Sequence, residues 1–263
     1  MKTLQLNGRD ASGDDVRALA ALNYGHFTSM RVQGGAVQGL SLHHGRLQAA
    51  TAELFGTTLD IERVSDCLRQ ALRGRQDAWL RVTVFSRDFD FRATERALET
   101  DVLVSVAPPL LPLSRPLRLR TVDFIRPLWH LKHVGTLPQF HHRRQARLAG
   151  FDDALFVDDE RGIAEGTLWN IGFWTGDTVV WPDAPALAGV TAQLITGALT
   201  HMGIPQARMG VNRGALETYV GAFACNAAGL QEVSEIDGAL LPASGPCRTL
   251  AAEALAAVPW DRI

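Results

Sequence analysis

Residues 127–135 read Pro127-Leu128-Trp129-His130-Leu131-Lys132-His133-Val134-Gly135. Lys132 stands among apolar residues on both sides, which is unusual because lysine is almost never fully buried. Burial disfavours the charged form of an amine and makes it nucleophilic toward carbonyl groups. The ordinary alternative is a surface lysine whose stem packs on apolar residues while its charge reaches solvent. Both interpretations are open from this stretch alone.

An isolated acid follows downstream in Glu165-Gly166-Thr167-Leu168-Trp169-Asn170-Ile171. Glu165 ends a turn and leads into an apolar strand, so its carboxylate needs a partner if it is buried. An ordinary acid at a strand end fits equally well. Further on, Leu187-Ala188-Gly189-Val190-Thr191 leads into a predicted helix, with Thr191 as the expected N-cap. The free amides at such a helix start can bind an anion.

The composition is that of a folded protein with a hydrophobic core. The chain has 263 residues, of which 46% are hydrophobic and 21% charged, enough for one large domain or two modest ones. A net charge of -2 gives no electrostatic case for nucleic acid or an anionic membrane. We find no apolar run of the roughly 18 residues that a membrane helix needs and no signal peptide. Three widely spaced cysteines, Cys67, Cys225 and Cys247, argue against a disulfide framework and favour the cytoplasm.

Hydrophobic periodicity predicts a mixture of helices and strands. We expect a helix from a Ser41 cap to Gly56, one over 64–72 closed by Gly74, and one carrying Leu194 to Met202 stopped by Gly203. The expected strands are 80–85, 102–107, 117–122, 154–157, 168–174 and 178–181. Prolines 108, 109, 112 and 116 mark a stiff linker. The sequence therefore predicts two α+β domains, a small one over 1–108 and a larger, strand-rich one over 117–263, joined by 109–116.

Common catalytic motifs are absent from the sequence. There is no Gly-x-Ser-x-Gly, no phosphate loop and no dinucleotide fingerprint. His130 and His133 are followed by His141 and His142, and such spacing can supply metal ligands. Pro138 interrupts the segment and no carboxylate stands at a matching offset, so we expect no metal site.

Several short blocks together resemble one family. In order, the blocks are Tyr24-Gly25-His26-Phe27-Thr28-Ser29-Met30-Arg31-Val32, His43-His44-Gly45-Arg46-Leu47, Lys132, Gly150-Phe151-Asp152-Asp153-Ala154-Leu155, Glu165-Gly166 with Asn170, Leu187-Ala188-Gly189-Val190-Thr191, and Cys225-Asn226-Ala227. Each block is weak alone, but their common order resembles the fold-type IV, or class IV aminotransferase, group of pyridoxal phosphate enzymes. That group includes branched-chain aminotransferases, D-amino acid transaminases and aminodeoxychorismate lyases. The resemblance runs from about Tyr24 to about Ile236.

The resemblance implies a role for each matching residue. Lys132 would carry pyridoxal phosphate as a Schiff base and move the proton at the substrate carbon. Glu165 would pair with the pyridine nitrogen of the cofactor. The phosphate would be held by Arg46, by the amides of Val190 and Thr191 with the Thr191 hydroxyl, and by Asn226 and Ala227. The resemblance also implies a small N-terminal α/β domain, a C-terminal pseudo-barrel over 117–263 that carries Lys132, and a homodimer.

The substrate pocket departs from the family pattern. Ala192 replaces a frequent arginine, and Leu137 stands where aminotransferases often have an aromatic residue. Candidate substrate residues are Phe27, Ser29, Arg31 and Arg87. Arg31 can bind a substrate carboxylate or brace its strand. Arg87 can also bind a substrate carboxylate, or it can lie in an exposed loop. The segment Asp88-Phe89-Asp90-Phe91-Arg92 replaces the glycine-rich stretch of the lyases.

We predict an aminotransferase that moves an amino group between an amino acid or amine and a 2-oxo acid. The lysine motif Lys132-His133 and the hydroxyl of Ser29 resemble the aminodeoxychorismate lyases, so elimination on the same scaffold is the first alternative. A non-catalytic relative that acts as a binding module is the second. Retention of Lys132, Glu165 and Arg46 argues against it.

Overall fold

The chain forms two compact units, which a computed structural model describes over residues 3–111 and 115–263. The first unit comprises Met1–Leu110, Leu131–Gly135 and Trp260–Ile263, and the second comprises Leu111–His130 and Thr136–Pro259. Both units contain helices and strands, and each has its own hydrophobic core. The predicted α+β class is therefore confirmed. Residues 112–114 of the predicted linker lie outside the described residues.

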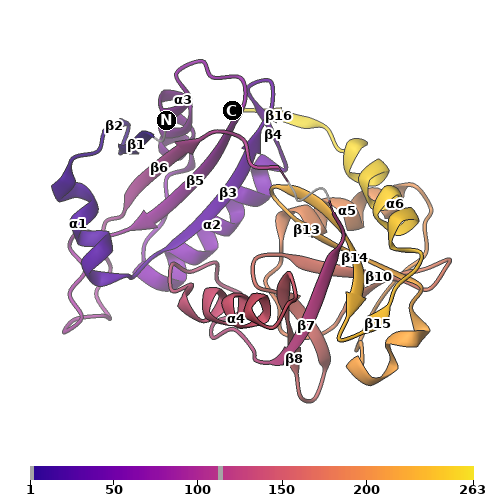
Figure 1. The fold of residues 1–263 in the computed structure, drawn as a ribbon. Helices are drawn as coiled ribbons and strands as arrows, with labels where there is room; N and C mark the ends of the chain where they lie inside the picture. Colours follow the sequence, from indigo (N-terminus) through magenta and orange to yellow (C-terminus); the bar gives the residue numbers. More distant parts are fainter. Residues whose placement is uncertain (1–2, 112–114) are drawn as a thin grey trace. The chain divides into compact units, whose positions relative to one another are not determined.

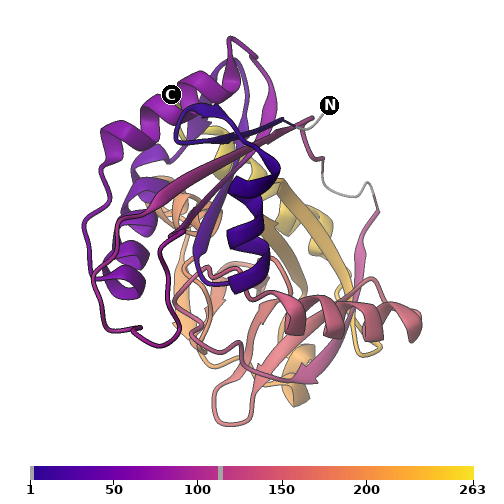
Figure 2. The same ribbon diagram turned by 90° about the vertical axis from the view of Figure 1, so that its left-hand side faces the viewer.

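A five-stranded antiparallel sheet organises the first unit, in the order β2-β1-β6-β5-β3 (Figure 1). Its elements are β1 (Thr3–Leu6), β2 (Arg9–Asp10), α1 (Gly13–Leu22), β3 (His26–Val32), β4 (Ala36–Gln38), α2 (Leu40–Phe55), α3 (Ile61–Leu72), β5 (Ala78–Phe85), β6 (Asp101–Ala107) and β16 (Trp260–Arg262). Alternating residues such as Met30, Leu80 and Val82 point toward α2 and α3 and form the core with them. Helix α1 packs instead against Leu6, Phe85 and Leu103, and Figure 2 shows it in front of the strands.

The edge of this sheet explains where Lys132 belongs. Strand β3 pairs with β5 on one side only. On its other side the Phe27 amide donates to the Lys132 carbonyl at 2.9 Å, and the Val134 amide donates to the Gly25 carbonyl at 2.9 Å. These bonds satisfy backbone groups that an edge strand would otherwise expose. The structure therefore groups Lys132 with the first unit, whereas we expected it within the 117–263 domain.

A nine-stranded sheet dominates the second unit, in the order β12-β11-β10-β13-β14-β7-β8-β9, with β15 beside β14. Its elements are β7 (Leu117–Asp123), α4 (Leu137–Leu148), β8 (Asp153–Asp158), β9 (Gly162–Gly166), β10 (Asn170–Trp174), β11 (Val179–Pro182), α5 (Val190–His201), β12 (Gln206–Met209), the 3-10 helix η1 (Arg213–Thr218), β13 (Gly221–Asn226), β14 (Gly229–Ile236), β15 (Ala239–Leu240) and α6 (Ser244–Ala256). The Ile163 amide donates to the Val211 carbonyl at 2.8 Å, which joins β9 to the segment after β12. The two ends of the sheet are thereby linked around a core that includes Leu119, Phe173 and Val233.

Helix ends are where the expected elements differ from the observed ones. Helix α2 begins after Gly39, whose φ of 70° is left-handed, so Ser41 lies inside the first turn and is not the cap. Helix α5 begins after Gly189, so Thr191 is likewise inside its first turn. Helix α3 is closed by Arg73 in place of Gly74. Each difference is one or two positions, because neighbouring residues compete for the capping geometry.

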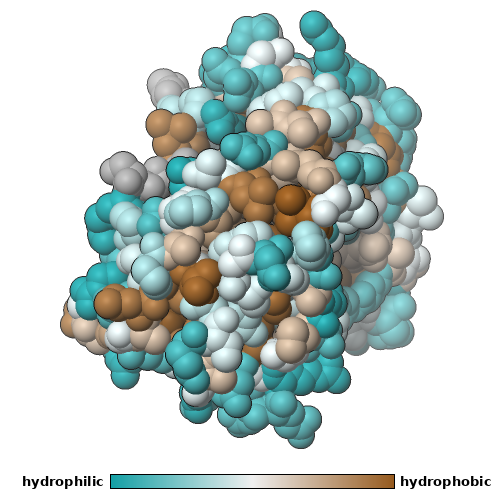
Figure 3. Space-filling model, turned by 90° about the vertical axis from the view of Figure 1, so that its right-hand side faces the viewer, coloured by the Kyte–Doolittle hydropathy of each residue, from teal (hydrophilic) through white to brown (hydrophobic). Residues whose placement is uncertain are grey.

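The surface mixes polar and apolar residues. Figure 3 shows hydrophobic residues in patches between hydrophilic ones on one face of the molecule. Large exposed apolar side chains include Leu137 and Phe140 on α4, which are 79% and 51% exposed. None of the described helices is long and apolar enough to cross a membrane.

Candidate active site

Lys132 lies beside an aromatic ring that carries a second cation. Its Nζ is 4.9 Å from the centroid of the Phe27 ring, and the Arg81 guanidinium carbon is 3.6 Å from the same centroid. Such cation–π contacts hold a charged group in place at modest energy. Phe27 is buried in β3 and Arg81 comes from the neighbouring strand β5. The first unit thus gathers two positive groups around one buried ring.

Arg46 adds a third cation to this part of the first unit. Its Nη2 donates to the Thr28 hydroxyl and to Nδ1 of His43, the latter at 3.3 Å, while its Nε is buried without a hydrogen-bond partner. Among the described residues, no carboxylate forms an ion pair with Arg46. Burial lowers the pKa of Arg46 to about 10. Burial also holds the pKa of His43 well below its ordinary value, helped by the charges of Arg46, His44 and Lys132. Arg46 is therefore a largely desolvated cation whose protein partners are neutral.

Glu165 lies in the second unit, where each of its carboxylate oxygens accepts a hydrogen bond. Glu165 lies near the end of β9 and is only 6% exposed. Oε1 accepts from Nε of Arg126 at 3.2 Å, and Oε2 accepts from the Leu187 amide at 3.2 Å. Arg126, also 6% exposed, further donates from Nη2 to the Trp129 carbonyl. The two donors fix the orientation of a buried carboxylate, and the guanidinium compensates its charge.

A buried network next to Glu165 explains why its strand ends where it does. Asp153 is 1% exposed and accepts from the Thr167 hydroxyl and from Nε1 of Trp169, each at 2.8 Å. These bonds hold the turn between β9 and β10. A Cβ on Gly166 would lie 2.2 Å from the Trp169 ring, so the residue after Glu165 has to be glycine. The predicted strand over 168–174 consequently starts later, at Asn170.

The remaining predicted cofactor residues of the second unit lie near this turn. The Asn170 side chain donates to the Leu187 carbonyl at 2.8 Å, which ties β10 to the loop before α5. A Cβ on Gly189 would come within 1.9 Å of Oδ1 of Asn170, so the loop can approach only because residue 189 is glycine. Asn226 donates to the Leu168 carbonyl at 3.2 Å, and Ala227 follows it in the turn after β13. The hydrogen bonds thus bring the Glu165 turn together with the start of α5 and the end of β13.

The start of α5 is open to an anion. Gly189 provides no side-chain cap, and Val190 and Thr191 occupy the first turn of a 12-residue helix. The first amides of a helix have no partner within it and carry partial positive charge. These groups have the donor chemistry that binds a phosphate. In the first unit, Arg46 with its unpartnered Nε offers donors of the same kind. Taken unit by unit, the residues present therefore fit a phosphorylated cofactor.

The candidate substrate residues separate into two groups. Phe27, Ser29 and Arg31 alternate along β3 and so share one face of that strand, with Ser29 opposite Arg81. Arg87 is different, because it donates to both oxygens of Asp101 at 2.8 and 2.9 Å. These bonds give Arg87 a structural role inside the first unit, and we do not carry it into the proposed site.

Sequence reasoning passed over Thr28, His43, Arg81 and Arg126. Two signals for them were present. Arg126 stands between Ile125 and Pro127, an apolar setting like that of Lys132. His43 and Arg46 are three positions apart, which places them on one face of a helix.

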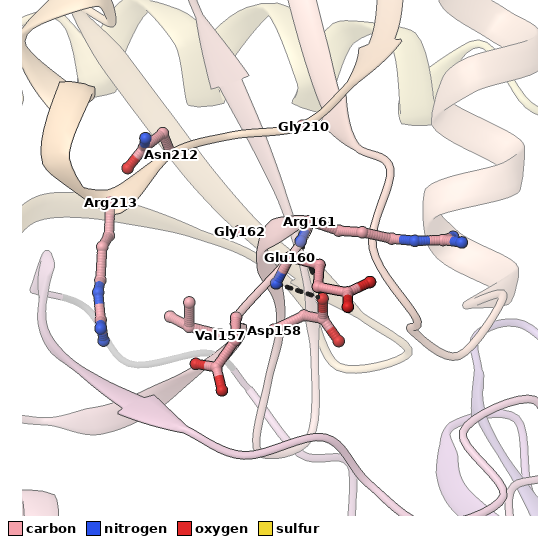
Figure 4. Close-up of a pocket in the computed structure, with 9 residues that line it drawn as sticks. Val157, Asp158, Glu160, Arg161, Gly162, Gly210, Asn212 and Arg213 are labelled. Carbon is pink, nitrogen blue, oxygen red and sulfur yellow. Dashed lines mark hydrogen bonds between the residues drawn. The ribbon is translucent and has the colours of Figure 1, made fainter.

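A surface pocket elsewhere contains none of the predicted site residues. It has a volume of about 250 Å³ and lies between the β8–β9 turn and residues 210–213 (Figure 4). Asp158 there accepts from the amides of Glu160 and Arg161 at 3.0 and 2.8 Å, which shapes the turn. No group of three or more potential metal ligands occurs within residues 3–111 and 115–263.

Comparison with known proteins identifies the family. Residues 25–236 match the family described as amino-transferase class IV. A Rickettsia bellii protein named "Probable branched-chain-amino-acid aminotransferase" is 25% identical over 224 residues, 80% of this chain and 77% of that protein. The branched-chain aminotransferase from Thermoproteus uzoniensis with norvaline has a TM-score of 0.84 at 22% identity, over 96% of this chain and 93% of that one. A hypothetical aminotransferase from Mycobacterium tuberculosis in its PLP-bound form has a TM-score of 0.79 at 18% identity, over 96% and 98%. The two structures share the fold, and the family match spans most of the sequence. This chain therefore belongs to the class IV aminotransferases.

Proposed function

We propose that this protein transfers an amino group between an amino acid or amine and a 2-oxo acid, using pyridoxal phosphate bound to Lys132. The observation that carries the proposal is the state of Arg46. Arg46 is half-buried with its Nε buried and unpartnered, and among the described residues it bonds only a hydroxyl and a neutral imidazole, so its charge calls for an anion from outside the chain. The charge of Lys132 also lowers the pKa of His43, so the Lys132 amine lies near Arg46.

Each residue then has one task. Lys132 would hold the cofactor through Nζ and would move the proton at the substrate carbon. Glu165 would accept from the pyridine N–H, with its orientation fixed by Arg126 and the Leu187 amide. The phosphate would be held by Arg46, by the first turn of α5 and by the turn of Asn226 and Ala227. Pyridoxal phosphate, when bound, supplies a carbonyl for the amine and an electron sink for the substrate carbon.

Covalent trapping tests this assignment. We expect that incubation with pyridoxal phosphate followed by borohydride reduction modifies one peptide, and that mass spectrometry locates the adduct at Lys132. The variant Lys132→Ala is the control and should show no adduct. A wild-type protein that remains unmodified would contradict the proposal, as would an adduct that persists in the variant.

Product analysis separates transamination from elimination. Ser29 supports the lyase as a second candidate, because its hydroxyl is on the same face of β3 as Phe27 and opposite Arg81. With an amino donor and no 2-oxo acid, a transaminase stops after one half-reaction. A lyase would instead release a keto acid such as pyruvate over many turnovers without an acceptor. We expect the first result.

The proposed assembly is a homodimer. Helix α4 exposes Leu137, Phe140 and Leu148, and a solvated helix rarely keeps several large apolar side chains uncovered. A second copy of the chain is the partner that the family resemblance implies. Light scattering should give twice the chain mass of 28.6 kDa.

A further inference from the structure

A buried hydrogen-bonded chain runs from Arg46 through Thr28 to His43. Thr28 lies on β3 and is 0% exposed, while His43 and Arg46 lie on α2. Arg46 donates from Nη2 to the Thr28 hydroxyl, and that hydroxyl lies 2.7 Å from Nδ1 of His43. A guanidinium can only donate, so the Thr28 oxygen accepts from Arg46. Nη2 of Arg46 also lies 3.3 Å from Nδ1 of His43, so Nδ1 is an acceptor and the Thr28 hydroxyl donates its proton to it.

His43 completes the chain as a neutral acceptor. Its pKa is held well below its ordinary value, chiefly by burial and next by the charge of Arg46. Because the neutral ring has one N–H and Nδ1 accepts from Arg46 and Thr28, that proton lies on Nε2. Both groups that hold the guanidinium are thus uncharged.

Neutral hydrogen-bond partners affect the charge of Arg46 differently from a carboxylate. An aspartate or glutamate at position 28 would fix the guanidinium equally well, but it would also neutralise its charge and compete with an incoming anion. Thr28 and His43 fix Nη2 and leave the positive charge uncompensated. Nε of Arg46 remains a buried donor without a partner. The arrangement orients a cation and keeps it available.

We propose that Thr28, hydrogen-bonded to His43, is a positioning residue that holds Arg46 for the phosphate of the cofactor. This inference rests on the proposed function. It assigns Thr28 no contact with substrate or with reacting atoms. Its effect is therefore specific to ligands that carry the phosphate.

Binding of two related aldehydes tests the proposal. The dissociation constants of pyridoxal phosphate and of pyridoxal, which lacks the phosphate, are measured by absorbance titration of wild type and Thr28→Val. We expect the variant to bind pyridoxal phosphate about tenfold to a hundredfold more weakly, as for loss of a hydrogen bond that orients a charged group. Binding of pyridoxal should change by less than about twofold, and Thr28→Ser should restore wild-type affinity for both.

Thr51→Val is a matched control on α2, the helix that carries His43 and Arg46. Thr51 is also 0% exposed and its hydroxyl lies 2.9 Å from Nε2 of His26, so the variant removes a similar buried contact without touching Arg46. We expect it to leave the ratio of the two dissociation constants unchanged. Equal weakening of both aldehydes by Thr28→Val, or no weakening, would overturn the inference. If Thr28→Val does not fold, His43→Leu is measured with the same expectation. A wild type that binds neither aldehyde refutes the proposed function itself, which is a distinct result.

Discussion

The buried Glu165 of the second unit and the half-buried Arg46 of the first are compensated in opposite ways. In the second unit, Glu165 is matched by a buried guanidinium at 3.2 Å and by a backbone amide at 3.2 Å. In the first unit, Arg46 is held by a hydroxyl and a neutral imidazole, and its Nε has no partner. A desolvated charge that lacks a counter-charge is unfavourable. The Glu165 pair is therefore stable without a ligand, whereas Arg46 would be stabilised by a bound anion. Glu165 is thus a charge that the protein itself compensates, and Arg46 is a charge that a ligand would compensate.

Removing the cation from the anchored pair should have the largest effect. Arg126→Met leaves the Glu165 carboxylate buried without its guanidinium, and breaking such a pair costs about 3–5 kcal/mol of the free energy of unfolding. Urea unfolding of the cofactor-free protein measures this loss. Arg118→Met is the control, because Arg118 pairs with Glu235 at 2.7 Å but is half exposed, and we expect a loss below about 1 kcal/mol. Similar losses in the two variants would mean that the buried Arg126–Glu165 pair stabilises the fold no more than a half-exposed pair does.

Acid should weaken the first unit through its neutral histidines. Burial, with the charge of Arg46, lowers the pKa of His26 to about 4 from an ordinary value near 6.5. Between these values the unfolded chain binds more protons than the folded one, so this stabilisation is complete above about pH 6.5 and is lost progressively as the pH falls toward 4. For His26 alone the loss between pH 7 and pH 5 is about 2 kcal/mol.

The measurement is urea unfolding at pH 7 and pH 5 for wild type and His26→Gln. Glutamine keeps a polar atom for Thr51 but does not titrate, so the variant should lose less stability on acidification by about that amount. An unchanged pH dependence in His26→Gln would mean that His26 is not held neutral. That result would remove His26 as a source of the acid sensitivity of the first unit.

Local pattern predicted much of the fold, and the residues that it missed depend on distant contacts. Lys132 and Glu165 were singled out because each is a charge in an apolar stretch, which is a local signal, but their proposed roles came from the family resemblance. The place of Lys132 in the first unit could not be predicted, since it depends on hydrogen bonds to β3, about a hundred positions away. Thr28 is an ordinary strand residue in sequence, and only the fold brings it under Arg46. Partners of buried charges are thus the part of a site that sequence reasoning misses most easily.

The smallest effect, and the one with opposite sign, is expected when the unpaired cation itself is removed. Arg46→Met takes a desolvated charge out of the first unit and leaves Thr28 and His43 bonded to each other at 2.7 Å, so no buried polar group loses its only partner. Replacing poorly compensated buried charge by an apolar side chain of similar size is neutral or stabilising. We expect the free energy of unfolding of the cofactor-free protein to stay constant or rise by about 1 kcal/mol. Pyridoxal phosphate, in contrast, should bind far more weakly. Urea unfolding with and without the cofactor measures both effects. A loss of stability near that of Arg126→Met would show that the protein itself compensates the charge of Arg46. The cation would then need no bound anion.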